Sequence, residues 1–197
     1  MGSREQILDA LKAKTRVAAL PGPWRTRRVF EDPAGRFEAS MQGLKGEVHR
    51  ANSVSEAWKT VDALLDEFGA ERVVVDADVL DEIVPAARWP KRSCHVVGKS
   101  DGDLRAFCAE ADVGLTGVTA ALVETGSLIV ESGPGKSRLA SLLPPVHIAM
   151  VPLSRLTTDL FTWSADRTGP IATNVTLISG PSKTADIEFT LTLGAHG

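Results

Sequence analysis

The sequence predicts an α/β fold in which helices flank a mainly parallel sheet. Residues 72–76 (RVVVD) form a short β-branched run, as expected for a strand that is buried on both faces. An amphipathic helix pattern over residues 54–68 precedes that run. A second strand pattern at residues 93–98 and a helix pattern at residues 103–111 follow it. Strands that alternate with helices in this way favour a parallel sheet with crossover helices.

The chain of 197 residues is long enough for one domain with a substantial core. We expect an α/β domain over residues 47–197 and a helical N-terminal extension with a connector over residues 1–46. The net charge of −3 and a single small cluster, Arg25, Arg27 and Arg28, give no support to nucleic-acid binding. The chain contains neither a membrane-length apolar run nor an N-terminal signal core, so we expect no membrane insertion and a cytoplasmic location.

The sequence of the N-terminal extension predicts two helices. Ser3 and Gln6 can form a capping box that starts a helix over residues 3–19, and Pro21-Gly22-Pro23 would end it. Residues 20–35 are expected to form an irregular connector before a second helix, Arg36 to Leu44. A short strand over residues 47–51 would then lead into the α/β domain.

Ser53 and Glu56 predict a capping box for the amphipathic helix over residues 54–68, and Gly69 would close it. Residues 112–119 are rich in Gly and Thr, and residues 127–131 are expected to form a buried strand. Between them, Glu124-Thr125-Gly126 is typical of a turn with Gly126 at positive φ. The functional alternative places Glu124 and Thr125 in the same cleft as the turn at Gly180.

Residues 133–137 (GPGKS) are similar to a phosphate-binding loop, but Val130 stands where that motif requires a glycine. A turn with a solvated Lys136 is therefore favoured. Pro144-Pro145 would end a helix over residues 137–143, and residues 146–151 predict a buried strand. His147 in that strand is expected to be satisfied by its neighbours, and a further amphipathic helix is expected over residues 156–163.

The apolar strand over residues 175–179 stops at Gly180-Pro181, and polar residues follow immediately. Ligands often bind beyond the carboxyl ends of strands in α/β folds, and free N–H groups beside Lys183 would suit an anion. An ordinary solvated turn is the alternative. The candidate site consists of Glu124 as the catalytic candidate and of the ligand-binding candidates Thr125, Gly126, Ser127, Gly180, Pro181, Ser182, Lys183, Thr184, Asp186 and His196.

Cysteine and histidine usage predicts no metal and no redox centre in this chain. Cys94 and Cys108 are the only cysteines, which is too few for a cluster held by four thiolates. The four histidines are isolated in sequence and lack the spacing of metal ligands. We therefore expect no cofactor in this chain and expect both cysteines to be small buried hydrophobic residues.

Three blocks together resemble the LUD-domain family, and within it the lactate utilization protein C group. They are residues 121–128 (ALVETGSL), 143–149 (LPPVHIA) and 179–188 (SGPSKTADIE), the last followed by LGAHG at residues 193–197. The resemblance implies the fold shared by sugar-phosphate isomerases, CoA transferases and the folate cyclo-ligase, the NagB/RpiA/CoA-transferase-like fold.

The resemblance also implies a function. In that family, L-lactate is oxidised to pyruvate by a three-component system, and the partner proteins carry iron–sulfur clusters. This chain would be the non-redox component, which binds a small anionic ligand, iron–sulfur lactate utilization proteins, or both. The alternative is a stand-alone enzyme that acts on a carboxylate, phosphate or acyl thioester. CoA transferases use a Glu before Asn-Gly as nucleophile, and Glu124 is similar, although Thr125 replaces the Asn.

Overall fold

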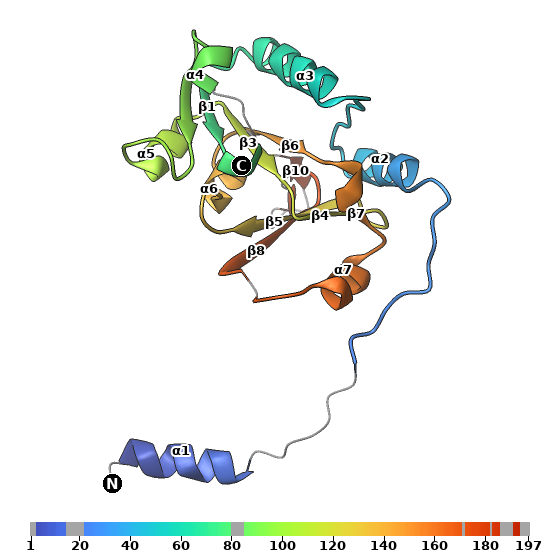
Figure 1. Cartoon of the computed structure of the whole chain (residues 1–197), viewed down its shortest axis with the longest axis vertical. Helices are drawn as coiled ribbons and strands as arrows, with labels where there is room; N and C mark the ends of the chain where they lie inside the picture. The colour runs from blue at the N-terminus through green and yellow to red at the C-terminus, as the bar shows by residue number, and fades with distance from the viewer. Residues whose placement is uncertain are drawn as a thin grey trace.

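The predicted parallel sheet is present in the computed structural model, which describes residues 3–14, 22–79, 85–170, 172–181, 183–185 and 191–193. Its four strands lie in the order β2-β1-β3-β6, and every neighbouring pair is parallel. These strands are β1 (Arg72–Val75), β2 (Ser93–Val96), β3 (Val113–Gly117) and β6 (Val146–Met150). The α/β prediction is therefore confirmed (Figure 1).

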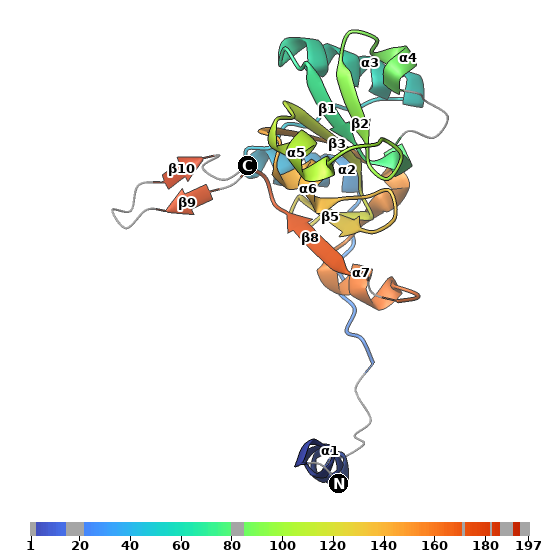
Figure 2. The same ribbon diagram turned by 90° about the vertical axis from the view of Figure 1, so that its left-hand side faces the viewer.

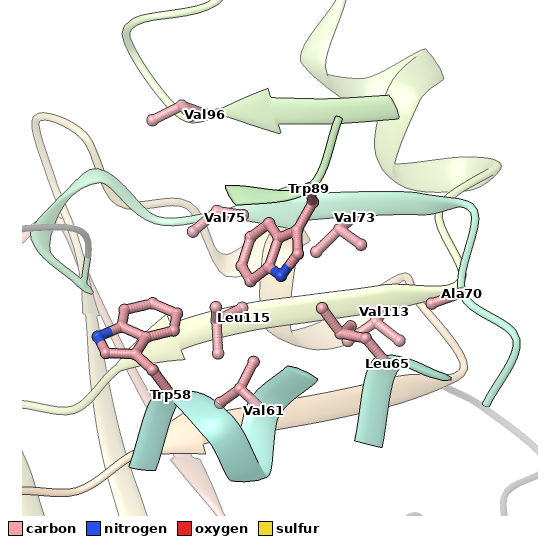
Figure 3. Packing of buried hydrophobic residues seen from close by; sticks show 10 residues of the cluster. All are labelled: Trp58, Val61, Leu65, Ala70, Val73, Val75, Trp89, Val96, Val113 and Leu115. Carbon is pink, nitrogen blue, oxygen red and sulfur yellow. The ribbon is translucent and has the colours of Figure 1, made fainter. Parts of the chain in front are cut away.

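Helices cover both faces of this sheet. α3 (Val54–Glu67) lies on one face, where its Trp58, Val61 and Leu65 contact a cluster that includes Val73, Val75, Val113 and Leu115 (Figure 3). On the other face, Val74 packs with Cys108 of α5 (Leu104–Ala109) and Ala140 of α6 (Arg138–Leu142). The alternation along β1 is the period-two pattern of a strand buried on both sides.

The local signals at α3 act as predicted. The Ser53 hydroxyl accepts a hydrogen bond from the Glu56 backbone N–H at 3.1 Å, and the Glu56 carboxylate accepts one from the Asn52 N–H at 2.8 Å. Gly69 has φ +59° beyond the C-terminal end of the helix. The chain then continues through β1 and η1 (Ala77–Val79). α4 (Pro85–Arg88) precedes β2.

A second sheet of four strands, which was not expected from the sequence, adjoins the first. Its order is β7-β4-β5-β8, with β4 parallel to β7 and antiparallel to β5, and with β5 antiparallel to β8. The strands are β4 (Ala120–Leu122), β5 (Ser127–Ser132), β7 (Leu156–Thr157) and β8 (Asn174–Ile178). β3 and β6 pair in the first sheet, and the chain beyond each strand pairs again as β4 and β7 in the second.

Two helices enclose the second sheet. On one face, Phe37 and Met41 of α2 (Pro33–Gly43) pack in a cluster with Val123 and Leu128. On the other face, Trp163 of α7 (Leu160–Asp166) packs against Leu122 and Ile129. α2, which was assigned to the N-terminal extension, thus contributes to the core of this sheet.

The remaining elements lie at the periphery. α1 (Ser3–Lys14) lies apart from both sheets in the two views (Figures 1 and 2). β9 (Lys183–Ala185) and β10 (Leu191–Leu193) form a separate antiparallel pair that projects from one side (Figure 2). Among the described residues, no helix combines the length and the apolar character needed to cross a bilayer.

Three element predictions were wrong. The helix expected over residues 156–163 begins only at Leu160, because Leu156 and Thr157 pair with β4 and the Asp159 carboxylate caps the helix by accepting the Thr162 N–H at 2.8 Å. Residues 47–51 form no strand. α2 begins at Pro33 rather than Arg36, after Asp32 caps it through the Gly35 N–H.

Candidate functional site

The two turns that were predicted to share a site lie side by side. β5 and β8 are antiparallel, and Leu128 pairs with Ile178. This register brings Ser127 next to Ser179, and their hydroxyl oxygens are 2.7 Å apart. The Thr125 hydroxyl lies 2.9 Å from that of Ser127, so one hydrogen-bonded chain joins the two turns.

The C-terminal end of α2 covers both turns. Gly126 has φ +71°, which confirms the turn interpretation, and a Cβ at this position would lie 2.5 Å from the Met41 backbone nitrogen. Gly180 has φ +78°, and a Cβ there would lie 2.6 Å from the Leu44 carbonyl oxygen. Both glycines therefore allow a close approach of backbone to backbone, and α2 occupies the space beside them.

Glu124 forms an ion pair with Arg28 of the connector. The Glu124 side chain is 31% exposed, whereas that of Arg28 is 60% exposed. The backbone of Glu124 is fixed because its N–H donates to the Thr158 carbonyl at 3.0 Å and its carbonyl accepts from the Ser40 hydroxyl at 3.3 Å. The turn thus holds this carboxylate at a defined place on the surface.

An open hollow of about 340 Å³ lies beside this ion pair, between the connector and the second sheet. Its wall includes Arg28, Phe30, Val123, Leu156, Thr157 and Thr158. Sequence reasoning recognised Arg28 only as part of a small arginine cluster. Its contact with Glu124 could not be anticipated, because no local pattern relates the two residues.

The connector is held against α7 by several contacts. Trp24 meets Phe161 edge-to-face with ring centroids 4.9 Å apart, and Arg25 forms an ion pair with Asp166. Burial alone would raise the pKa of Asp159. Hydrogen bonds from Thr162 and Thr26 and the charge of Arg28 outweigh this effect, so the pKa of Asp159 lies below its usual value. Residues 24–28 therefore contact both ends of α7, since Trp24 meets Phe161 in its first turn and Arg25 pairs with Asp166, its last residue. The connector passes beside α7 in Figure 1.

The rest of the predicted site is described only in part. Pro181 is exposed. Lys183 and Thr184 belong to β9, where they pair with Leu193 and Thr192. Ser182, Asp186 and His196 lie outside the described residues. Anion binding by residues 180–186 and by His196 stays a prediction.

A second polar cluster, missed by the sequence reasoning, lies at the carboxyl ends of β1 and β3. The chain runs from β1 to β2 on one side and returns to β3 on the other, which makes this edge a topological switch point. Asp76 follows β1 directly and is 1% exposed, and its carboxylate accepts the Ser137 backbone N–H at 3.0 Å. Burial raises the pKa of Asp76 to about 7, although the Ser137 hydrogen bond opposes the shift.

Lys136 also belongs to this cluster. Its ammonium lies 2.7 Å from the Asp78 carboxylate, and its side chain is 34% exposed, so the expectation of a solvated Lys136 was wrong. The Asp78 charge raises the pKa of Asp76 further, whereas the Lys136 charge lowers it. An aspartate directly after a strand buried on both faces was the signal that could have identified this cluster.

His147 has a hydrogen-bond partner and Cys108 is buried, as expected, whereas Cys94 is only partly buried. His147 Nε2 lies 2.8 Å from the Thr116 hydroxyl, and burial lowers the pKa of His147 to about 4. Cys108 is buried, and desolvation, with a smaller effect of the Asp76 charge, raises the pKa of its thiol to about 11. Cys94 is partly buried, and desolvation likewise raises its pKa.

Comparisons with known proteins support the family resemblance. The chain is 31% identical over 157 residues to a lactate utilization protein C from Halalkalibacterium halodurans, an alignment that covers 75% of this chain and 68% of the relative. It is 30% identical to a lactate utilization protein C from a Geobacillus species, with 99% of this chain and 76% of the relative covered. A lactate utilization protein C from an Exiguobacterium species is 40% identical over 99 residues, which cover 47% of this chain and 43% of the relative.

A solved structure supports the fold. The crystal structure of a DUF162 family protein from Deinococcus radiodurans matches with a TM-score of 0.58 and 21% identity, covering 75% of this chain and 87% of the other. The sequence model of the LUD domain matches residues 34–197, which include both sheets and every site residue predicted from the sequence, but not Arg28. The chain therefore belongs to the LUD domain family.

Proposed function

We propose that this chain is the non-redox component of an L-lactate utilization system that oxidises lactate to pyruvate. The observation that carries the proposal is its alignment with a lactate utilization protein C over 99% of this chain. The oxidation releases two electrons, and this chain offers little to accept them. Its sequence holds two cysteines, which are too few for an iron–sulfur cluster held by four thiolates.

The electrons would therefore pass to iron–sulfur partner proteins, which this chain binds or positions. An exposed aromatic pair supports such an interaction. Trp24 is 62% exposed and Phe161 is 56% exposed, and the two rings contact each other at the junction of the connector with α7. Aromatic side chains on a surface are typical of protein interfaces. A small anionic ligand bound by this chain would complete the proposed role.

Growth on L-lactate tests the system-level role. A bacterial strain that lacks its own lactate utilization protein C should grow on L-lactate as sole carbon source when this chain is expressed together with its native partner proteins. Growth on glucose is the control for general fitness. Failure to restore growth with soluble, well-expressed protein would refute the proposal.

Copurification tests the partner contact. The tagged chain should retain iron–sulfur proteins of the system, and the double variant Trp24→Ala, Phe161→Ala should lose them. Val54→Ala is a matched control, because Val54 is 68% exposed on α3, away from α7. Equal recovery of the partners by all three proteins would exclude the aromatic pair as the contact.

A stand-alone enzyme is the second candidate. The location of Glu124 beside the hollow favours it, since its carboxylate could attack the carbonyl of an acyl thioester, forming an acyl anhydride as the C–S bond breaks and the CoA thiolate leaves. In that case the purified chain should turn over an acyl-CoA with a small carboxylate acceptor without partners. Glu124→Gln should abolish this turnover without changing the far-UV circular dichroism. Absence of turnover in the parent protein would remove this candidate.

A further inference from the structure

The hollow of about 340 Å³ between the connector and the second sheet is lined by Arg28, the ion-pair partner of Glu124. We propose that it binds a small organic monocarboxylate, and that the Arg28 guanidinium receives the ligand's carboxylate in exchange for that of Glu124. The inference deepens the proposed function, on which it rests for the physiological role of the ligand. It places the anion site on the connector side of Glu124 rather than between the glycine turns.

The charge of the site favours a monoanion. Arg28 is the only cation among the described residues that line this hollow. An adjoining hollow of about 500 Å³ shares Pro33 and Leu156 with it and carries the carboxylates of Glu31 and Asp32. One guanidinium can bind one carboxylate through two parallel hydrogen bonds, whereas a phosphate dianion would face uncompensated repulsion from the nearby carboxylates.

The shape and lining favour a short ligand with an apolar end. A volume of about 340 Å³ is at the lower end of the range for small-molecule sites. Leu156 and Phe30 supply apolar surface, and the second sheet holds Leu156 in place through its pairing with Ala121. Thr157 and Thr158 are polar residues of the same wall, and a threonine hydroxyl can donate to or accept from a hydroxyl or keto oxygen next to the ligand's carboxylate.

The existing ion pair makes the exchange feasible. Arg28 and Glu124 are both accessible to solvent, with side chains 60% and 31% exposed, and ion pairs of this kind contribute little net stability. A ligand carboxylate can therefore replace that of Glu124, which turns towards water while its backbone remains fixed by Thr158. Glu124 is thus an internal competitor for Arg28. Removal of the Glu124 charge should therefore strengthen the binding of a ligand carboxylate to Arg28.

Isothermal titration calorimetry on the full chain at low ionic strength tests the proposal. The titrants are L-lactate, pyruvate, acetate and inorganic phosphate. We expect the three carboxylates to bind more tightly than phosphate. Arg28→Gln should weaken carboxylate binding about tenfold or more, the range for loss of a charged hydrogen-bonding partner. Arg27→Gln is the matched control, because Arg27 is an exposed neighbour outside the hollow, and should retain the parent affinity.

Glu124→Gln gives the sharper test. Removal of the competing charge should tighten carboxylate binding several-fold, whereas a Glu124 that contacts the ligand directly would give weaker binding.

Amide NMR shifts locate the site independently. Titration with L-lactate should move the resonances of Glu124 and Thr158 more than those of Ser179 and Gly180.

Three results would overturn the proposal. They are no binding of any carboxylate, equal binding by the parent and the Arg28→Gln protein, and tighter binding of phosphate than of L-lactate. The growth test on L-lactate distinguishes failure of the Arg28 site from failure of the proposed function. A chain that restores growth but binds no carboxylate refutes the site alone, whereas a chain that binds carboxylates through Arg28 without restoring growth refutes the function alone.

Discussion

Asp76 accepts a hydrogen bond from the backbone N–H of Ser137 at 3.0 Å and thereby joins the end of β1 to the start of α6. Ser137 is also the N-cap of α6, since its hydroxyl accepts the Leu139 N–H at 3.2 Å. The loop before α6 is fixed as well, because the Ala77 N–H donates to the Gly135 carbonyl at 2.8 Å. The loop at the carboxyl edge of the parallel sheet is therefore held by a buried carboxyl group and by a backbone hydrogen bond.

Asp76 should make the protein less stable as the pH rises. Its pKa is about 7 in the folded protein and 3.8 without burial, so between about pH 4 and pH 7 the folded state holds a proton that the unfolded chain has released. Stability from this group declines through that window and reaches its minimum above pH 7. Asp76→Asn keeps an acceptor for Ser137 and removes the charge. Urea unfolding should show the variant more stable than the parent at pH 8, by on the order of 2–4 kcal/mol, and similar to it at pH 4.

Lys136→Met tests whether Asp76 causes this pH dependence of stability. Lys136 lowers the pKa of Asp76, so its removal should move the stability decline of the parent to higher pH. The Asp76→Asn background should show no such movement. A pH profile that is the same in the parent and in Asp76→Asn would contradict a protonated Asp76 in the fold.

His147 should act in the opposite direction. Its pKa is about 4 in the folded protein and 6.5 without burial, so the unfolded chain binds a proton more readily as the pH falls from about 6.5 to 4. Stability from this group is lost on acidification through that window. His147→Gln should therefore resist acid better, relative to its own stability at pH 7, than the parent does. Asp76 and His147 change the free energy of unfolding in opposite directions between about pH 4 and pH 6.5. The parent should therefore show a flatter dependence of unfolding free energy on pH than Asp76→Asn or His147→Gln. A steeper dependence in the parent would show that one of the two pKa shifts is wrongly assigned.

The parts of the fold that the sequence could predict are those set by local rules. The caps of α3 and the β-branched run of β1 depend on neighbouring residues, and both were predicted. No strand was predicted for β3, because its segment is rich in Gly and Thr, with glycines at positions 114 and 117. The structure explains Gly114, since a Cβ there would lie 1.7 Å from the Ala140 carbonyl oxygen of α6. A glycine required by close helix–strand packing looks the same in sequence as a glycine required by a turn.

In the candidate site, too, the features set by local sequence were predictable and those set by tertiary contacts were not. The turn at Gly126 followed from its composition, and the turn at Gly180 followed from the Gly180-Pro181 pair at the end of an apolar strand. The pairing of Arg28 with Glu124 and the cluster around Asp76 arise from tertiary contacts between distant segments. The Asp159 cap shows the same limit on a small scale, because the apolar spacing of Leu156, Leu160 and Trp163 suggested a helix that cross-strand pairing with β4 shortens.

Gly126→Ala should destabilise the fold more than an alanine at an uncrowded glycine. Both Gly126 and Gly69 have positive φ, at +71° and +59°, so an alanine at either position costs about 1–2 kcal/mol from the backbone conformation. A Cβ at Gly69 meets nothing within 4 Å, whereas one at Gly126 would lie 2.5 Å from the Met41 backbone nitrogen. The clash should raise the cost for Gly126→Ala to roughly 3 kcal/mol or more. Urea unfolding of both variants measures the difference, and equal losses would show that α2 does not press against this turn.

The hydroxyls of Ser127 and Ser179 should be energetically coupled, which would define their role in the predicted site. They lie 2.7 Å apart, and Ser127 is 4% exposed whereas Ser179 is exposed, so the bond is only partly shielded from water. In a double-mutant cycle with alanine at each position, the coupling should be about 0.5–1.5 kcal/mol. Ser127→Ala should also cost more than Ser179→Ala, because Ser127 additionally contacts the Thr125 hydroxyl at 2.9 Å. If this coupling is found while L-lactate binding stays unchanged in both single variants, the serines join the two turns structurally and the ligand lies elsewhere. Loss of L-lactate binding in Ser179→Ala at unchanged stability would instead return the site to the glycine turns.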